Sequence, residues 1–178
     1  SFTRYVGDDG RLHATFEQIG ASTGRMSCHS PNLQAVIKDT EHRECFSCAS
    51  HRRLIIADYS ACELRILAEM SQDPVFMTAF HNGEDLHSKV ASSLWGVEVS
   101  KTNNAHLRHR AKSVNFGIVY GMGVGGLARQ LNIDKQQAQK ILEQYFTTFP
   151  SIKSYLTDSA ILAMERGYAE TISGRRMY

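Results

Sequence analysis

The most chemically suggestive residues of this sequence are two cations and two aromatic residues that recur at every fourth position. Arg108, Lys112, Phe116 and Tyr120 have this spacing, which places them along one face of an α-helix. A nucleotide has a matching layout, because arginine and lysine bind phosphate oxygens and an aromatic ring stacks on a base. The same spacing fits an ordinary amphipathic helix with cations at its rim. By itself it suggests nucleotide binding without deciding it.

A second candidate is the carboxylate that follows a short apolar run. Residues 54–57 read Leu-Ile-Ile-Ala, which predicts a buried strand, and Asp58 comes directly after them. A carboxylate on a rigid element is a suitable ligand for the Mg²⁺ ions that assist phosphoryl transfer. The position also suits an N-cap of the helix expected next, and the segment alone favours the N-cap.

Cysteine and histidine form a weaker pattern. Cys45, Cys48 and His51 lie close together, with Cys28 and His29 upstream, and such residues can ligate zinc. A second regularly spaced ligand pair is missing, and Cys45 could equally be a small buried hydrophobic residue. Four cysteines without a secretory segment indicate reduced thiols in a cytosol-like compartment. A zinc-bearing adaptor is therefore a minor alternative.

The charge is unevenly distributed along the chain. The 178 residues carry 20 Lys and Arg against 18 Asp and Glu, a net charge of +2 that does not by itself announce a nucleic-acid-binding protein. Residues 101–133, however, contain no acid, and they include both cations of the four-residue spacing. An acid-free cationic segment fits phosphate binding, although a solvated helix face is the common explanation of a charge run.

The composition and the order of apolar and polar residues predict the helices and strands that position these residues. The hydrophobic fraction of 42% supports a core, and no stretch of about 20 apolar residues predicts a membrane span. The first 58 residues predict short extended pieces, with a turn at 7–10. The chain downstream of Pro74 predicts helices that begin at Asp85, Asn103 or Asn104, Asp134 and Pro150. A glycine-rich break is expected at 121–126, and a strand at 168–172 precedes an unfinished hairpin.

Together these segments resemble the family A DNA polymerases, of the bacterial DNA polymerase I type. Residues 58–65 look like motif A of that family, and residues 108–122 look like motif B, which lies on a helix of the fingers. The resemblance continues in the family's order over residues 23–27, 31–34, 83–87, 126–131, 167–171 and 174–176. It covers nearly the whole chain, and motif B at this length is highly specific.

The resemblance implies roles for the residues around an incoming nucleotide. Arg108, Lys112 and His87 would hold the triphosphate, and Lys112 would also protonate the leaving pyrophosphate. Phe116 would pack on the sugar and base, and phenylalanine at this position implies discrimination against dideoxynucleotides. Glu63 would be the steric gate that excludes a ribose 2′-hydroxyl.

The resemblance also implies metal and DNA contacts. Asp58 would be catalytic as a ligand of both metal ions, and the backbone carbonyl of Tyr59, beside the nucleotide, would help to hold one of them. Tyr120 would stack at the template–primer terminus. The remaining expected contacts with the primer–template duplex come from Arg25, Asn32 and Gln34.

The implied fold is α+β and mostly helical, with a partial polymerase palm of short strands and a helical fingers subdomain. Residues 1–73 would be a partial palm with motif A, 74–166 the helical fingers with motif B, and 167–178 a return to the palm. Motif C, a His-Asp hairpin with the second metal carboxylate, would lie beyond Arg176. We therefore expect a fragment of a larger enzyme that is inactive alone, since one carboxylate cannot hold the usual two-metal centre.

The expected function is that of a DNA-templated DNA polymerase, which transfers a nucleotide from a dNTP to a primer 3′-hydroxyl by a two-metal mechanism. The expected cofactor is Mg²⁺, with two ions in the complete enzyme. Expected partners are primer–template DNA, deoxynucleoside triphosphates and the remainder of the polymerase chain. A cytoplasmic, nucleoid-associated location is expected, with phage or organellar origin open. A non-catalytic nucleic-acid-binding module is the alternative, while Glu63 argues against a single-subunit RNA polymerase.

Overall fold

The computed structural model describes residues 2–178, which fall into two compact units. The first unit contains the chain up to Asp58 together with Met177, and the second runs from Tyr59 to Arg176 with Tyr178. The division between compact units thus falls ahead of position 73, where the sequence placed the end of the palm region. The helix that follows Asp58 belongs to the second unit.

The first unit is built from short elements, as the sequence predicted. Strands β1 (Thr15–Glu17) and β2 (Ser27–His29) pair antiparallel, with Phe16 opposite Cys28. The other elements are the 3₁₀ helices η1 (Phe2–Tyr5) and η2 (Leu33–Ala35) and the short helix α1 (Thr40–Glu44). The predicted turn at 7–10 is confirmed by a hydrogen bond from Gly10 N–H to the Gly7 carbonyl, at 2.9 Å.

The predicted buried strand at 54–57 is wrong. The segment is not hydrogen-bonded as a strand, and the side chains of Leu54, Ile55 and Ile56 are 59%, 92% and 82% exposed. The reason is the lack of a partner, because neither sheet in the described part of the chain extends to this segment. An isolated extended segment can neither pair its backbone groups nor bury its apolar side chains.

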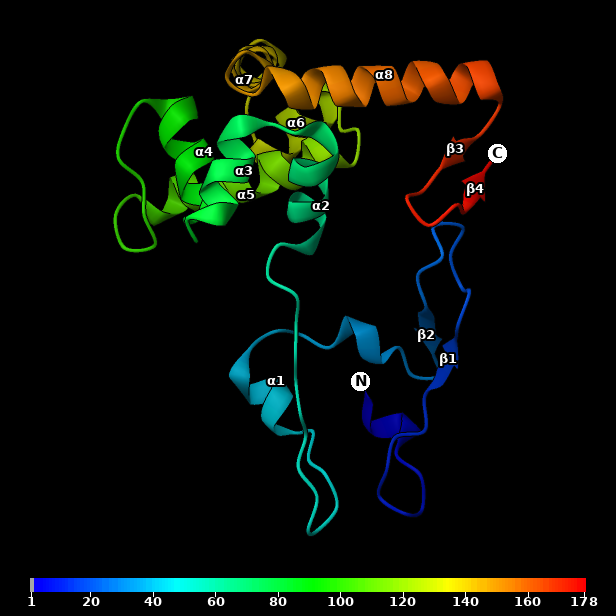
Figure 1. The fold of residues 1–178 in the computed structure, drawn as a ribbon. Coiled ribbons are helices and arrows are strands. Elements are labelled where there is room, and N and C mark those ends of the chain that lie inside the picture. The colour runs from blue at the N-terminus through cyan, green and yellow to red at the C-terminus, as the bar shows by residue number, and fades with distance from the viewer. Residues whose placement is uncertain (1) are drawn as a thin grey trace. The chain divides into compact units, whose positions relative to one another are not determined.

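The second unit is a helical assembly (Figure 1). Its helices are α2 (Cys62–Ser71), α3 (Pro74–His81), α4 (Leu86–Trp95), α5 (Ala105–Val119), α6 (Val124–Leu131), α7 (Lys135–Thr148) and α8 (Pro150–Arg166). The strands β3 (Ala169–Glu170) and β4 (Arg176–Met177) form a two-stranded sheet, so the hairpin that was expected to be unfinished is closed. The α+β, mostly helical fold class is confirmed. Among residues 2–178, no helix is long and apolar enough to cross a membrane.

Capping residues set several of the helix starts. Asp134 accepts a hydrogen bond from Gln137 N–H at 2.7 Å, as expected for the N-cap of α7. Asp73 caps α3 by accepting from the N–H groups of Val75 and Phe76 at 3.1 and 3.2 Å. The start of α5 after Asn104 also agrees with the sequence.

Helix α5 lies against the core of this unit. Its buried residues Val114 and Ile118 belong to the same apolar cluster as Leu64 of α2, Phe76 of α3 and Leu127 of α6. Burying an aliphatic or aromatic side chain of this size stabilises the fold by about 1.5–3 kcal/mol. The core therefore fixes which face of α5 is turned outward.

The predicted glycine-rich break at 121–126 is only partly confirmed. The chain leaves α5 at Tyr120, but Gly125 and Gly126 lie inside α6. Gly126 is needed there for packing, since a Cβ at this position would lie 2.6 Å from Met122 Cγ. A Cβ on Gly117 of α5 would similarly lie 3.0 Å from Met122 Sδ. These two glycines let Met122 pack between α5 and α6.

We therefore predict that Gly126→Ala destabilises the unit, whereas Gly125→Ala does not. A Cβ on Gly125 meets no atom within 4 Å, so this control gains helix propensity without a clash. Overpacking at Gly126 is expected to cost about 1–3 kcal/mol, partly offset by propensity. Thermal and urea unfolding of both variants measures the difference. Equal stability of the two variants would contradict the packing role.

Candidate functional site

The four residues spaced along α5 are brought together as the sequence predicted. Arg108, Lys112 and Phe116 lie on the helix, and Tyr120 is its C-terminal cap. The rings of Phe116 and Tyr120 are stacked, with centroids 6.4 Å apart and planes at 15°. Lys112 is exposed and makes no ion pair within residues 2–178. The result is a helix face with cations at one end and stacked aromatic rings at the other.

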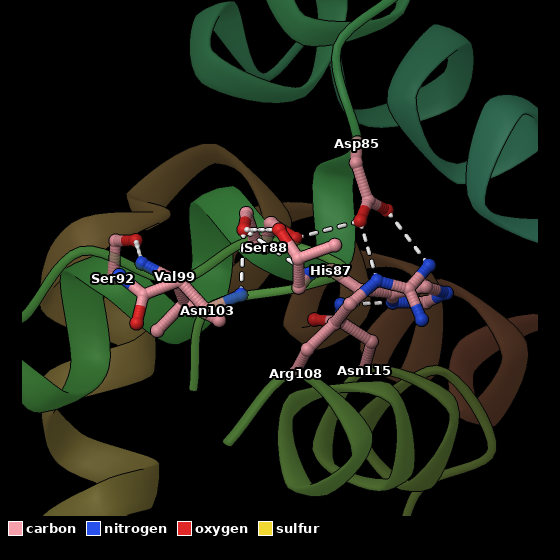
Figure 2. A network of polar contacts seen from close by, with 10 residues as sticks. Asp85, His87, Ser88, Ser92, Val99, Asn103, Arg108 and Asn115 are labelled. Carbon is pink, nitrogen blue, oxygen red and sulfur yellow. Dashed lines mark hydrogen bonds and ion pairs between the residues drawn. The ribbon is translucent and has the colours of Figure 1, made fainter. Parts of the chain in front are cut away.

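Arg108 is held by a carboxylate at the start of α4. Figure 2 shows Asp85 facing the guanidinium, and the pair makes two hydrogen bonds. The Nε donates to Oδ2 at 2.5 Å and the Nη2 donates to Oδ1 at 3.1 Å. Ser88 Oγ also donates to Oδ2, at 2.6 Å. A two-point contact of this kind fixes the plane of the guanidinium and leaves its Nη1 edge free to bind an anion.

The pKa of Asp85 lies below its usual value of 3.8. Burial by itself raises this pKa, but the hydrogen bonds from Arg108 and Ser88 and the positive charge of Arg108 together outweigh burial. The carboxylate is therefore ionised at neutral pH, and the pair with Arg108 is a true ion pair.

The loop between α4 and α5 is tied back to α4. Val99 N–H donates to Ser92 Oγ at 3.0 Å, and Asn104 Nδ2 donates to the Glu98 carbonyl at 2.9 Å. Figure 2 shows the first of these contacts beside the Asp85 network. The loop that leads to the start of α5 is thus held against the C-terminal part of α4.

His87 lies beside the same face of α5 and is buried. Its Nδ1 is 3.0 Å from Asn115 Nδ2, and its ring centroid is 5.9 Å from that of Phe116. Burial lowers the pKa of His87, and the positive charges of Arg108 and Lys112 lower it further, while Asp85 opposes them. The net direction is downward, so the imidazole is neutral at pH 7.

The aromatic end of the face is linked to α2. Tyr120 Oη donates a hydrogen bond to Glu63 Oε1 at 3.2 Å. Glu63 lies in the first turn of α2 and is half-buried, while Tyr120 is 59% exposed. The contact places the predicted gate carboxylate directly at the predicted stacking residue.

Asp58 and Tyr59 are both exposed. The N-cap alternative for Asp58 is wrong, because α2 begins at Cys62 and its N-cap residue is Ala61, which has a left-handed φ of 51°. No group of three or more His, Cys, Asp or Glu side chains in the described part of the chain could hold a metal ion. Asp58 and the Tyr59 carbonyl therefore offer only part of the six oxygen ligands that Mg²⁺ requires.

Three further residues predicted to contact DNA, Arg25, Asn32 and Gln34, lie in the first unit. Asn32 Oδ1 accepts from Gln34 N–H at 3.0 Å and so caps η2, and Gln34 Nε2 donates to the Met26 carbonyl at 3.2 Å. Arg25 directly precedes Met26 and is exposed. These contacts tie the segment around Arg25 to the segment from Asn32 to Gln34.

The cysteines are engaged in other contacts. Cys45 Sγ donates to the Glu41 carbonyl at 3.3 Å and Cys48 Sγ to the Arg52 carbonyl at 2.8 Å. Cys28 is buried, where its Sγ accepts from Leu33 N–H at 3.3 Å. Since the described residues contain no three-ligand metal cluster, the zinc alternative finds no support.

The residues that the sequence did not single out are Asp85, Ser88 and Asn115. Asp85 was expected only as a helix start, yet its side chain does not cap α4 and binds Arg108 instead. The sequence did contain a signal for Asp85, because it is an acid two residues before His87 and α5 carries cations that could pair with it. Asn115 offered a clearer signal, because an amide on the apolar side of a helix needs a buried partner.

Comparison with known proteins identifies the family to which this helical unit and its cationic and aromatic helix face belong. The profile of DNA polymerase family A matches residues 2–178, so the chain belongs to this family. DNA polymerase I of Mycobacterium leprae is 41% identical over 181 residues, which cover 97% of this chain and 20% of that protein. DNA polymerase I of Treponema pallidum is 38% identical over 182 residues, which cover all of this chain and 18% of that protein.

A solved structure agrees with these relatives. The polymerase domain of Pol1 from M. smegmatis, in complex with DNA primer–template and dNTP, superposes with a TM-score of 0.86 at 39% identity. The match covers 98% of this chain and 32% of that one. The chain spans about a fifth of the length of the curated relatives that it matches.

We predict that Asp85→Asn destabilises the chain at pH 7 and that the difference from the wild type shrinks in acid. Because the folded pKa of Asp85 lies below 3.8, its stabilisation is present above that pH and is lost as the pH falls through the folded pKa. The free energy of unfolding at pH 7 is expected to fall by about 1 kcal/mol, because the ion pair is partly exposed to solvent. Urea unfolding at pH 7 and pH 3 measures it.

The matched control is Glu84→Gln. It alters the neighbouring acid, whose ion pair with Lys89 is more exposed than the pair of Asp85 and Arg108. Its effect is expected to be smaller at both pH values. A loss for Asp85→Asn that is the same at pH 7 and pH 3 would contradict the ion-pair assignment.

Proposed function

We propose that this chain forms part of a DNA-templated DNA polymerase and supplies its nucleotide-binding helix. The observation that carries the proposal is the outward face of α5, where Arg108 lies about two turns and Lys112 about one turn before the stacked rings of Phe116 and Tyr120. The family membership and the likeness to a polymerase domain in complex with DNA and dNTP support it.

In this proposal the cationic end of α5 binds the triphosphate of the incoming dNTP. Arg108, oriented by Asp85, forks onto phosphate oxygens through its free edge, and Lys112 acts as a mobile point charge. His87 adds a neutral hydrogen-bonding group. Phosphoryl transfer needs positioning and charge stabilisation above all, and these groups provide both. Lys112 would then give its proton to the leaving pyrophosphate.

The aromatic end of α5 receives the sugar and base. Phe116 packs on them, while Tyr120 stacks at the template–primer terminus. The hydrogen bond from Tyr120 holds the Glu63 carboxylate at this end, in a position to exclude a ribose 2′-hydroxyl. The chain after Tyr120, with Gly121 in a left-handed conformation at φ 74°, is a candidate pivot for closing the helix over a matched nucleotide.

The proposal assigns the rest of the chain by region. Residues 1–73 belong to the palm, 74–166 to the fingers and 167–178 to the palm again. Arg25, Asn32 and Gln34 contact the primer–template duplex. Asp58 and the Tyr59 carbonyl would be metal ligands, and water, dNTP phosphates and further carboxylates would supply the other oxygens. The proposed partners are DNA, dNTPs and the remainder of the polymerase.

A passive nucleic-acid-binding module is the second candidate. The cations of α5 would support it, because lysine and arginine can bind a DNA backbone without any transfer reaction. The two proposals differ at α5. The polymerase proposal requires this helix to bind a triphosphate, whereas the passive module requires only that DNA binds.

We predict that Lys112→Ala weakens binding of dATP and of inorganic tripolyphosphate to this chain by about tenfold, since a charged contact with phosphate contributes roughly 1.5 kcal/mol. Lys112 is exposed and unpaired within residues 2–178, so the fold should be unaffected. Arg108→Lys should weaken binding as well, because it keeps the charge and loses the fork. Isothermal titration calorimetry measures both.

The control for this experiment is Lys140→Ala, which removes an exposed cation from α7. It should leave both affinities unchanged. Equal effects of Lys112→Ala and Lys140→Ala would reduce the binding to non-specific charge attraction and contradict the role of α5.

We also predict that the 178-residue chain does not extend a primer at a rate comparable with that of a complete polymerase. Asp58 and the Tyr59 carbonyl provide too few oxygen ligands for two metal ions. A gel assay with primer–template, Mg²⁺ and four dNTPs measures extension. Extension at a rate comparable with that of a complete family A polymerase would show that the ligand set is sufficient.

A further inference from the structure

Asn115 is a fully buried amide in the middle of α5. Its Nδ2 lies 3.0 Å from Nδ1 of His87 on α4, and its Oδ1 has no hydrogen-bond partner among the described residues. Figure 2 marks the contact between the Asn115 amide and the His87 imidazole with a dashed line. A buried polar group left with one unpartnered atom calls for a physical reason.

The contact dictates which ring nitrogen of His87 carries the proton. An amide nitrogen only donates hydrogen bonds, so Nδ1 has to accept and must be unprotonated. Turning the amide over would direct Oδ1 at the ring and leave the Nδ2 group, with its two N–H donors, without a partner. The observed orientation gives the Nδ2 group a partner and leaves the Oδ1 acceptor without one. Unsatisfied buried donors are the rarer case in proteins, so this orientation is the favoured one.

The other ring nitrogen is available to a ligand. Nε2 makes no hydrogen bond within residues 2–178, and it is not among their fully buried polar atoms that lack a partner, so it reaches the surface. The charged groups that act on the ring are Asp85, Arg108 and Lys112, and the net effect of burial and charge keeps the imidazole neutral. A neutral ring with its proton on Nε2 is a hydrogen-bond donor.

We propose that Asn115 is a positioning residue that fixes His87 in the tautomer protonated at Nε2. His87 then offers an N–H donor to a phosphate oxygen without adding a third full charge beside Arg108 and Lys112. The use of that donor rests on the proposed function of α5, whereas the tautomer itself is a property of the chain alone. A buried amide in the nucleotide-binding helix thereby controls a group that it cannot itself present to a ligand.

Nitrogen-15 NMR of histidine-labelled protein tests the proposal directly. A long-range ¹⁵N–¹H correlation spectrum distinguishes the two neutral tautomers, and exposed His109 on α5 is an internal reference. We expect wild-type His87 to show a single tautomer with the proton on Nε2. Asn115→Asp should move a proton to Nδ1, because a carboxylate only accepts, and Asn115→Leu should yield a mixture of tautomers.

A wild-type proton on Nδ1 would overturn the proposal, and so would an Asn115→Asp protein that keeps Nδ1 unprotonated. Backbone amide spectra show whether each variant is folded, and the wild-type spectrum is decisive even if a variant is not. Adding tripolyphosphate to the same sample tests phosphate binding by His87 separately from the tautomer assignment. A shift of the Nε2 signal supports phosphate binding by His87. An unchanged Nε2 signal would contradict that part of the proposed function and leave the tautomer assignment standing.

Discussion

Helix α5 is subject to two demands at once, and the structure of the helical unit follows from them. One side has to be apolar and closely packed, as Ala111, Val114 and Ile118 are in the core. The other side carries the cations and aromatic rings that we propose meet a nucleotide. Since a helix repeats every 3.6 residues, a spacing of four keeps the cationic and aromatic residues on one stripe and the apolar residues on another. Burial of the apolar side in the core thus determines the direction in which the cationic and aromatic side faces.

The polar contacts add the precision that burial alone cannot give. The fork from Arg108 to Asp85 sets the plane of a guanidinium, the contact between Asn115 and His87 sets the state of an imidazole, and Tyr120 holds the Glu63 carboxylate. Each contact joins α5 to a neighbouring helix. The groups proposed to meet a nucleotide are therefore held before it arrives, which lowers the entropic cost of binding it.

The sequence predicted the helices well where local signals decide them. The cap at Asp134 and the start of α5 after Asn104 are such cases, and the stripe on α5 follows from spacing alone. The predicted strand at 54–57 was wrong because a strand needs a neighbouring strand to pair with, and the local sequence does not show whether one is present. The predicted break did not extend to Gly126, because this glycine lies inside α6 and makes room for the side chain of Met122. Asp85 was overlooked as a site residue because its partner lies 23 positions away.

The most direct test of the account is to map where a nucleotide binds. Backbone amide spectra of the ¹⁵N-labelled chain, recorded during titration with dATP, report every residue that meets the ligand. We predict that the perturbed signals cluster on α5 from Arg108 to Tyr120 and at His87 of α4. Perturbations confined to α7 and α8, or the absence of any cluster at saturating dATP, would contradict the assignment of α5 as the nucleotide-binding helix.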